Sequence, residues 1–235
     1  MLNLTDKSEL EKILDNRIAN VTFLNHYSYK LARKNIGAFS KMDYIFIDGF
    51  MLSFFYSCFV KKTRKSSFDM SSLAPMVLNY AVNNEMTICF VGTTKENMNK
   101  FIKQISLTYP RLKIILYRDG YFSDQNEKET FQRKVKALSP DIIVAGMGTP
   151  LQEQFLMDMT KIGWKGLGFT CGGFFHQTAM RGVEYYPNFI VKYELRWFYR
   201  ILNEKGVLRR YTYDFLTFIP IFIFDLLICK TKAKT

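Results

Sequence analysis

The side chains that could do chemistry follow short apolar runs along the chain. Residues 142–145 form an unbroken apolar run, which is typical of a strand buried on both faces. Gly146 and Gly148 come next, and glycine lets the backbone turn sharply and lets a ligand come close. A helix starting after such a turn presents free amides, which favour an anion such as a phosphate. The pattern indicates a candidate nucleotide site, although an ordinary strand-to-helix connection is the simpler interpretation of these residues alone.

The helix after this turn is expected to start within residues 149–152. Thr149 can cap the helix, and Pro150 suits its first position. Gln152 can close a capping box with Thr149. The amides that would face a ligand therefore belong to this short stretch.

A carboxylate follows a second apolar run. Residues 44–47 indicate a buried strand, and Asp48 and Gly49 come directly after it. Such a carboxylate could act as a base that takes a proton from a hydroxyl group. It could also accept hydrogen bonds from the backbone amides of a turn, and the residues alone favour this second role.

The charge of the chain predicts an anionic partner. The 235 residues include 33 Lys and Arg against 21 Asp and Glu, and 48% are apolar, which excludes a disordered chain. A net charge of +12 suits a nucleotide diphosphate, a lipid phosphate or a membrane surface. No nucleic-acid module or arginine-rich arm is present, so we expect no nucleic-acid partner.

The sequence predicts neither a metal site nor a disulfide framework. No Asp-x-Asp motif occurs, and the four cysteines have no Cys-x-x-Cys spacing. We therefore expect no metal and no cofactor. The N-terminus lacks the apolar segment of a signal peptide, so a reducing cytoplasm is expected.

Strands alternating with helices predict an α/β fold, a Rossmann-like and mainly parallel sheet flanked by helices. Ligands of such folds bind beyond the carboxyl ends of the strands, where Asp48, Gly92, Gly148 and Gly172 are expected to meet. A helix that is apolar all round is usually buried, and residues 50–60 have that pattern. Strands are expected at 21–24, 44–47, 87–91, 112–117, 142–145 and 166–170, and further helices at 5–17, 73–83, from 94 to about 107, and 131–138.

The C-terminal part changes character, so we divide the chain into a catalytic domain (1–190) and a basic, aromatic appendage (191–235). Residues 215–229 are apolar but too short and interrupted for a spanning helix, which needs about 20 residues. Lysines follow them, so a segment lying on an anionic membrane surface is favoured. A core helix and a subunit interface stay open as alternatives.

Six short motifs follow one another along the chain. They are Asp48-Gly49, Arg64 with Asp69, YPRLKIILYRDGYF at 109–122, GMGTPLQEQ at 146–154, Gly172-Gly173 with Phe175, and the ending RWFYRILNE with Arg209-Arg210-Tyr211. In this order they resemble the WecG/TagA/CpsF family, which is glycosyltransferase family 26, and the resemblance extends from about residue 21 to residue 211. His176, Arg196 and Lys205 stand where the family usually has Asp, Glu and Pro.

The resemblance implies an inverting glycosyltransferase that needs no metal. The substrates would be a UDP-sugar, with N-acetylmannosamine or another hexose, and a polyprenyl-diphosphate-linked saccharide of cell-surface polysaccharide synthesis. Asp48 would be the catalytic base, and Arg200, Arg209 and Arg210 would bind the diphosphate or the acceptor. The implied donor-binding residues are Asn25, Arg64, Asp69, Gly92, Gly146, Gly148, Thr149, Pro150, Gln152, Glu153, Gly172, Gly173 and His176.

The enzyme would then work in the cytoplasm, bound peripherally to the inner face of the cell membrane through the C-terminal segment. Formation of a homo-oligomer stays open. A nicotinamide-dependent oxidoreductase is a rival, but the turn at 146–152 lacks the third glycine of its fingerprint. A non-enzymatic basic protein at the membrane surface would explain the charge and the tail equally well.

Overall fold

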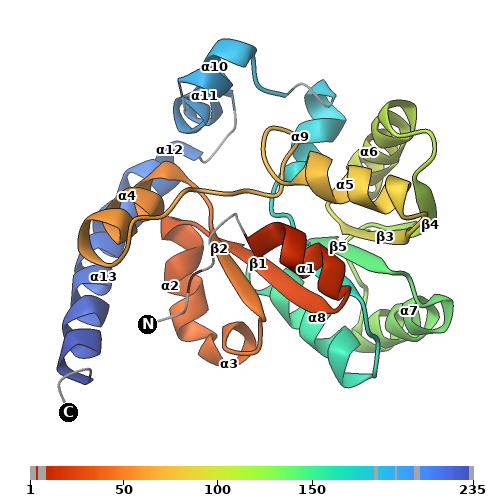
Figure 1. Ribbon diagram of the computed structural model, residues 1–235, viewed down its shortest axis with the longest axis horizontal. Helices are drawn as coiled ribbons and strands as arrows, with labels where there is room; N and C mark the ends of the chain where they lie inside the picture. The colour runs from red at the N-terminus through yellow and green to blue at the C-terminus, as the bar shows by residue number, and fades with distance from the viewer. Residues whose placement is uncertain (1–3, 5–8, 183–184, 194, 204–206, 233–235) are drawn as a thin grey trace.

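The protein is built on a six-stranded parallel sheet with helices on both faces (Figure 1). The structure, a computed structural model, describes residues 4, 9–182, 185–193, 195–203 and 207–232. The strand order is β2-β1-β6-β5-β3-β4, and every neighbouring pair is parallel. The predicted α/β class is therefore confirmed. The strands are β1 (Ala19–Leu24), β2 (Tyr44–Ile47), β3 (Thr87–Gly92), β4 (Lys113–Arg118), β5 (Ile142–Gly146) and β6 (Leu167–Thr170).

The apolar runs form strands because the sheet is covered on both faces. In β5, Ile142 and Val144 belong to one apolar core, while Ile143 and Ala145 belong to the core on the other face. Successive side chains of a strand point to opposite faces of the sheet. A strand that packs against an apolar core on each face therefore needs an unbroken apolar run. Polar side chains are thereby confined to the strand ends, apart from a small buried group described below.

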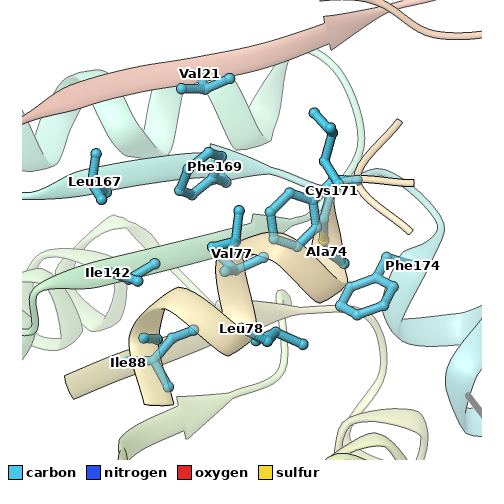
Figure 2. Packing of buried hydrophobic residues seen from close by; sticks show 14 of the residues in the cluster. Val21, Ala74, Val77, Leu78, Ile88, Ile142, Leu167, Phe169, Cys171 and Phe174 are labelled. Carbon is cyan, nitrogen blue, oxygen red and sulfur yellow. The ribbon is translucent and has the colours of Figure 1, made fainter. Parts of the chain in front are cut away.

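The helices divide between the two faces. Side chains of α1 (Leu10–Asn16), α5 (Ala74–Asn83), α6 (Lys95–Thr108) and α9 (Phe174–Arg181) pack in the first core. Figure 2 shows Val77 and Leu78 of α5 packed beside strand residues of that core. The second core holds side chains of α2 (His26–Lys34), α3 (Ile36–Phe39), α4 (Phe50–Phe59), α7 (Gln125–Leu138), α8 (Leu151–Lys161) and α13 (Tyr213–Lys232).

The predicted helices exist, with some bounds shifted. The first helix begins at Leu10, and the start expected for it at 5–8 lies outside the described residues. The helix expected at 131–138 begins six residues earlier, because Asp124 accepts a hydrogen bond from the amide of Glu127 and caps it. The C-terminal part adds α10 (Asn188–Lys192), α11 (Arg196–Asn203) and α12 (Val207–Tyr211) before α13.

The expected helix cap at Thr149 is wrong. Pro150 holds the capping position of α8, and no side chain caps the helix there. The hydroxyl of Thr149 instead donates to Glu153 at 3.3 Å, because Thr149 lies one residue too early to reach the first amides. Gln152 likewise reaches other partners, so no capping box forms.

The expectation that residues 50–60 form a fully buried helix is also wrong. Leu52 and Tyr56 of α4 are buried, whereas Phe54 and Phe59 are 51% and 53% exposed. The helix follows β2, which is an edge strand, and so has the protein on only one side. Its apolar outer side chains therefore face away from both cores.

Helix α13 packs against the second core, beside α2 and α4. Phe218 and Phe222 are buried in the second core, where both contact Phe55 of α4. Two ion pairs also connect α13 to α2: Lys30 to Asp214 at 2.7 Å and Arg33 to Asp225 at 3.0 Å. In the described part of the chain, one helical run, Val207–Ile228, is long and apolar enough to cross a membrane. The division at residue 190 stays a prediction.

Two glycines let β3 and β5 approach closely at their carboxyl ends. Gly92 and Gly146 are paired in register, and a Cβ atom on Gly92 would lie 2.3 Å from the carbonyl oxygen of Gly146. The backbone of Gly92 also has φ +149, a conformation that residues other than glycine rarely adopt. Gly92 is therefore required for strand packing.

We expect Gly92→Ala to lower the free energy of unfolding by about 2 kcal/mol or more, because the added methyl group overlaps backbone that cannot move aside. Urea denaturation monitored by circular dichroism measures this loss. Gly37→Ala is the matched control, since Gly37 has nothing within 4 Å of the added atom. Equal stability of the two variants would contradict this account of Gly92.

Candidate active site

A cavity of about 350 Å³ opens beyond the carboxyl ends of four strands. Asn25 follows β1, Asp48 follows β2, Gly148 follows β5 and Gly172 follows β6, and all four line it. A crevice at this place is where parallel α/β sheets bind ligands. Residues of α11 and α12 close the cavity from the C-terminal side, including Arg196, Trp197, Arg200, Val207 and Tyr211.

Asp48 is held in the cavity by the end of β2. Its amide donates to the carbonyl of Leu24 at 2.7 Å, which extends the pairing of β1 with β2 by one residue. Burial raises the pKa of the Asp48 carboxyl group, and the negative charge of Asp69 raises it further. Positive charges on Arg200, Arg196 and Lys65 oppose that rise. A carboxyl group with a raised pKa, open to a cavity, is suited to accept a proton.

Asp69 is the second carboxylate in the cavity, and it is fully engaged. Arg196 forms an ion pair with it at 3.2 Å, and the two side chains are only 17% and 15% exposed. The hydroxyls of Ser67 and Ser71 each donate to it at 2.6 Å. Arg196 also donates to the Ser71 oxygen at 2.7 Å. Helix α11 is thus connected to the loop that faces Asp48.

Cationic side chains line the cavity around the two carboxylates. Lys65 comes from the loop after α4, and Arg196 and Arg200 come from α11, one turn apart. Such side chains neutralise the charge of a phosphate or diphosphate group. In the described residues, no three His, Cys, Asp or Glu side chains are placed to hold a metal ion.

The opposite wall is formed by the two turns after β5 and β6. The side-chain oxygen of Gln152 accepts from the amide of Gly172 at 3.3 Å, and its amide group donates to Glu153 at 3.0 Å. These two bonds fix the orientation of the Gln152 side chain. Gly148 has φ +77 and open space where a side chain would lie, so its backbone is accessible from the cavity.

Glu153 lies behind this wall in a buried polar group. Its side chain is 0% exposed, and it accepts from Thr22 at 2.8 Å as well as from Gln152. Thr22 also pairs with Thr170, which lines the cavity. Burial raises the pKa of the Glu153 carboxyl group, against the lowering effect of these hydrogen bonds. Glu153 is therefore suited to position cavity side chains and does not reach the cavity itself.

The structure brings about half of the predicted site residues together. Asp48 faces the cavity together with eight of the other predicted residues: Asn25, Asp69, Gly148, Thr149, Gln152, Gly172, Gly173 and Arg200. Asn25 also caps α2, accepting from the amide of Ser28 at 2.9 Å.

The other predicted residues are not among those that line this cavity, and their binding roles stay predictions. Gly92 and Gly146 are used for strand packing, and a Cβ on Gly146 would lie 2.7 Å from Cys171 and Phe175. Arg64 is exposed, whereas Lys65 beside it lines the cavity. Arg209 is exposed and lies over the ring of Tyr213 at 5.8 Å. Pro150 and Glu153 lie outside the lining, and the side chain of Arg210 lies outside the described residues.

His176 does not face the cavity either. It is exposed on α9, and its Nδ1 lies 3.2 Å from the side-chain nitrogen of Asn97 on α6. The next residue, Gln177, is buried and lines the cavity together with Phe174, because residues three apart share a helix face. The polar group that α9 offers to a ligand is therefore Gln177.

Sequence reasoning missed several lining residues, namely Lys65, Ser67, Gln177, Tyr186, Arg196, Trp197 and Tyr211 as ligand-facing groups. Lys65 was missed because it is one of several basic residues in the same loop, and the sequence does not show which of them faces the cavity. Gln177 was missed because the sequence does not show which face of its helix points to the cavity. Arg196 carried a signal, since it replaces the Glu that the family usually has. An Arg that replaces an acid needs an acidic partner, and Asp69 is that partner.

Comparisons with known proteins identify the family and several relatives of this chain. The model of the glycosyl transferase WecG/TagA/CpsF family matches residues 4–233. The chain is 39% identical to a UDP-Gal:alpha-D-GlcNAc-diphosphoundecaprenol beta-1,4-galactosyltransferase of Shigella boydii over 219 residues, which are 92% of this chain and 91% of that protein.

More distant relatives carry another sugar specificity in their names. The chain is 27% identical to N-acetylglucosaminyldiphosphoundecaprenol N-acetyl-beta-D-mannosaminyltransferases of Bacillus spizizenii, over 73% of this chain and 65% of that protein, and of Staphylococcus aureus, over 67% and 58%. A match over nearly the whole chain excludes a dinucleotide-dependent oxidoreductase as the main interpretation. The chain is a glycosyltransferase and belongs to the WecG/TagA/CpsF family.

Proposed function

We propose that the protein transfers a hexose, with galactose as the first candidate, from a UDP-sugar to a polyprenyl-diphosphate-linked N-acetylglucosamine. The acceptor is supported by the Shigella, Bacillus and Staphylococcus relatives alike, whose names share an N-acetylglucosaminyl-diphosphoundecaprenol group. The donor is supported by the Shigella relative, which is more similar to this chain than the two that carry N-acetylmannosamine.

The observation that carries the proposal is the place of Asp48. Its carboxylate faces the cavity, has a raised pKa and lies among cationic side chains. In the reaction, Asp48 takes the proton of the acceptor hydroxyl while the hydroxyl oxygen bonds to the anomeric carbon. The bond from that carbon to the diphosphate oxygen breaks in the same step, and UDP leaves with the bonding electrons. A single displacement inverts the anomeric centre, so an α-linked donor gives a β-linked product.

The leaving diphosphate needs compensation of its charge, for which we propose cationic side chains in place of a metal ion. Lys65 and Arg200 line the cavity near Asp48, and Arg196, which lines it too, is paired with Asp69. Gly148 and Thr149 line the other wall directly before α8, and their backbone amides would add to this compensation. Hydrogen bonds between a charged side chain and a phosphate oxygen are about twice as strong as those between neutral groups.

The location follows from the acceptor, because a polyprenyl chain stays in the bilayer. We propose that the enzyme works at the cytoplasmic face of the membrane and that α13 lies along the surface. The ion pairs of Asp214 and Asp225 with α2, together with the burial of Phe218 and Phe222, keep α13 beside the catalytic body. A helix crossing the bilayer would have to give up these contacts. The outer apolar side chains of α13, such as Leu216 and Leu227, remain exposed for lipid.

Replacement of the base tests the mechanism directly. We expect Asp48→Asn to lower turnover about 10²–10⁴-fold, because the amide cannot accept the proton. Single-turnover transfer from UDP-galactose to a prenyl-diphosphate-linked N-acetylglucosamine measures this loss. The variant should keep the thermal unfolding midpoint and the donor affinity of the parent, and turnover close to that of the parent would reject Asp48 as the base.

The pair of Arg196 and Asp69 should set the pH dependence. Turnover requires ionised Asp48, so it is lost as the pH falls through the pKa of that group. Arg196→Gln removes a charge that lowers this pKa, so the acidic limb of the kcat profile should move to higher pH.

Asp69→Asn removes a charge that raises the pKa of Asp48, so its acidic limb should move to lower pH. Arg200 and Lys65 are the other charged groups among the described residues that act on Asp48, and both variants keep them. Shifts of the two profiles in the same direction would contradict the electrostatic account.

Metal dependence can be tested by chelation. If cationic side chains compensate the diphosphate, turnover should survive exhaustive EDTA treatment, and added magnesium should change it less than about twofold, since no step then needs a Lewis acid. Arg200→Ala should instead raise the KM for the donor or lower kcat. Turnover abolished by EDTA and restored by magnesium would disprove this part of the proposal.

A further inference from the structure

Helix α4 carries an unexpected apolar face directly after the catalytic carboxylate. Phe50, Phe54 and Cys58 are all exposed at intervals of four residues, which places them on one side of the helix. The opposite side is occupied, because Leu52 and Tyr56 are buried in the body. The rings of Phe50 and Phe54 stack with centroids 5.9 Å apart, so the exposed face is a continuous aromatic surface.

This face continues into the C-terminal helix. Phe55 contacts Phe215, Phe218 and Phe222 of α13 at centroid distances of 5.8 to 6.1 Å. Figure 1 shows α4 and α13 side by side at the edge of the molecule away from α6 and α7. Helix α13 exposes apolar side chains as well, among them Leu216 and Phe224, so exposed apolar groups gather on two neighbouring helices, as at an interaction site.

Basic residues border the aromatic face. Lys61, Lys62 and Arg64 are exposed directly after α4, and no acidic residue occurs between Phe50 and Asp69. An apolar face next to a cluster of cations is the pattern of a segment that lies in the interface of an anionic membrane.

A second copy of the chain fits this face less well. A symmetric dimer through this face would place the basic residues of both copies in one interface with no acidic residue of 50–68 to pair with them, which costs free energy through repulsion of like charges. Phe50 also lines the catalytic cavity, so a partner seated on α4 would lie against the cavity mouth. A lipid leaflet has neither disadvantage, since it is anionic and contains the acceptor.

We propose that α4 inserts its outer face into an anionic leaflet and so places the mouth of the cavity at the membrane surface. Lys61, Lys62 and Arg64 lie at the level of the lipid headgroups. Asp48 is two residues from Phe50, so the depth of insertion fixes the height of the base above the leaflet. The inference rests on the proposed lipid-linked acceptor, and it adds an attachment site that is separate from α13.

The first test is membrane binding of the full chain carrying Phe54→Ser and Phe59→Ser. Phe54 belongs to the face described above, and Phe59 lies beside it at the end of α4, with its ring 6.2 Å from that of Phe55. Both rings are about half exposed, so their loss should leave the fold intact. We expect the partition onto phosphatidylglycerol-containing vesicles to weaken about tenfold or more in a flotation assay. Leu107→Ser is the matched control, since Leu107 is 70% exposed on α6 and should bind like the parent. Unchanged binding of the double variant would overturn the proposal.

The second test reads the position of α4 itself. Cys58 is exposed on the proposed face, while Cys89 and Cys171 are buried with raised pKa values and should not react with a thiol label. With Cys229 replaced by serine, a polarity-sensitive fluorophore on Cys58 should shift to the blue when anionic vesicles are added.

A label on Lys134→Cys of α7, in a chain that also carries Cys58→Ser and Cys229→Ser, should not shift. Lys134 is exposed on a different face of the protein. If the emission of the fluorophore on Cys58 does not change when anionic vesicles are added, the proposed insertion of α4 is refuted. A blue shift that depends on protein concentration without vesicles would identify a second copy as the occupant, and would refute it too.

Failure of this inference can be told apart from failure of the proposed reaction. The double variant should turn over a water-soluble, short-chain acceptor like the parent and should lose about tenfold with a vesicle-embedded acceptor. If the parent transfers no sugar to either acceptor, the proposed reaction fails, while flotation and labelling still decide the role of α4. If the parent is active and the variant works equally well on vesicles, the role of α4 fails alone.

Discussion

A parallel sheet buried on both faces decides where this protein can do chemistry. All six strands run in one direction, and their central side chains fill two apolar cores. Charged groups placed inside would lose hydration, so those that a reaction needs are moved to the strand ends. The carboxyl ends of β1, β2, β5 and β6 lie side by side in the sheet order, and the cavity opens there. The position of Asp48 is therefore a consequence of sheet topology.

The electrostatics of the cavity are a balance of opposite effects on one carboxylate. Burial and Asp69 raise the pKa of Asp48, while Arg200, Arg196 and Lys65 lower it. Because Arg196 is paired with Asp69, the two act on Asp48 as a nearly neutral unit. Lys65 and Arg200 bring further positive charge to the same cavity. A base poised to accept a proton and a site that attracts an anion can thus exist within one small cavity.

The strands and the residues at their ends were predicted from the sequence more accurately than the side chains that face the cavity. Strands were predictable because burial on both faces demands unbroken apolar runs, and the glycines and Asp48 stood out as interruptions at the ends of those runs. Motif residues were less reliable, because a glycine serves close packing and ligand approach equally well, as Gly92 shows. The face that a helix presents depends on its neighbours, so His176 could not be separated from Gln177 by spacing alone.

The buried character expected of α4 fails for an informative reason. An apolar composition shows that a segment favours an apolar environment. It does not show whether that environment is a protein core or a lipid leaflet. The edge position of β2 leaves the outer face of α4 without protein to cover it, and α13 occupies only the side facing Phe55. Both helices are held to the body by aromatic packing, and α13 by two ion pairs as well. Anything that binds their outer faces is consequently held in fixed relation to the cavity. If a lipid leaflet covers these faces, as proposed, a lipid-linked substrate would meet its membrane and the cavity on one body, which would reduce the entropy cost of bringing its reactive end to Asp48.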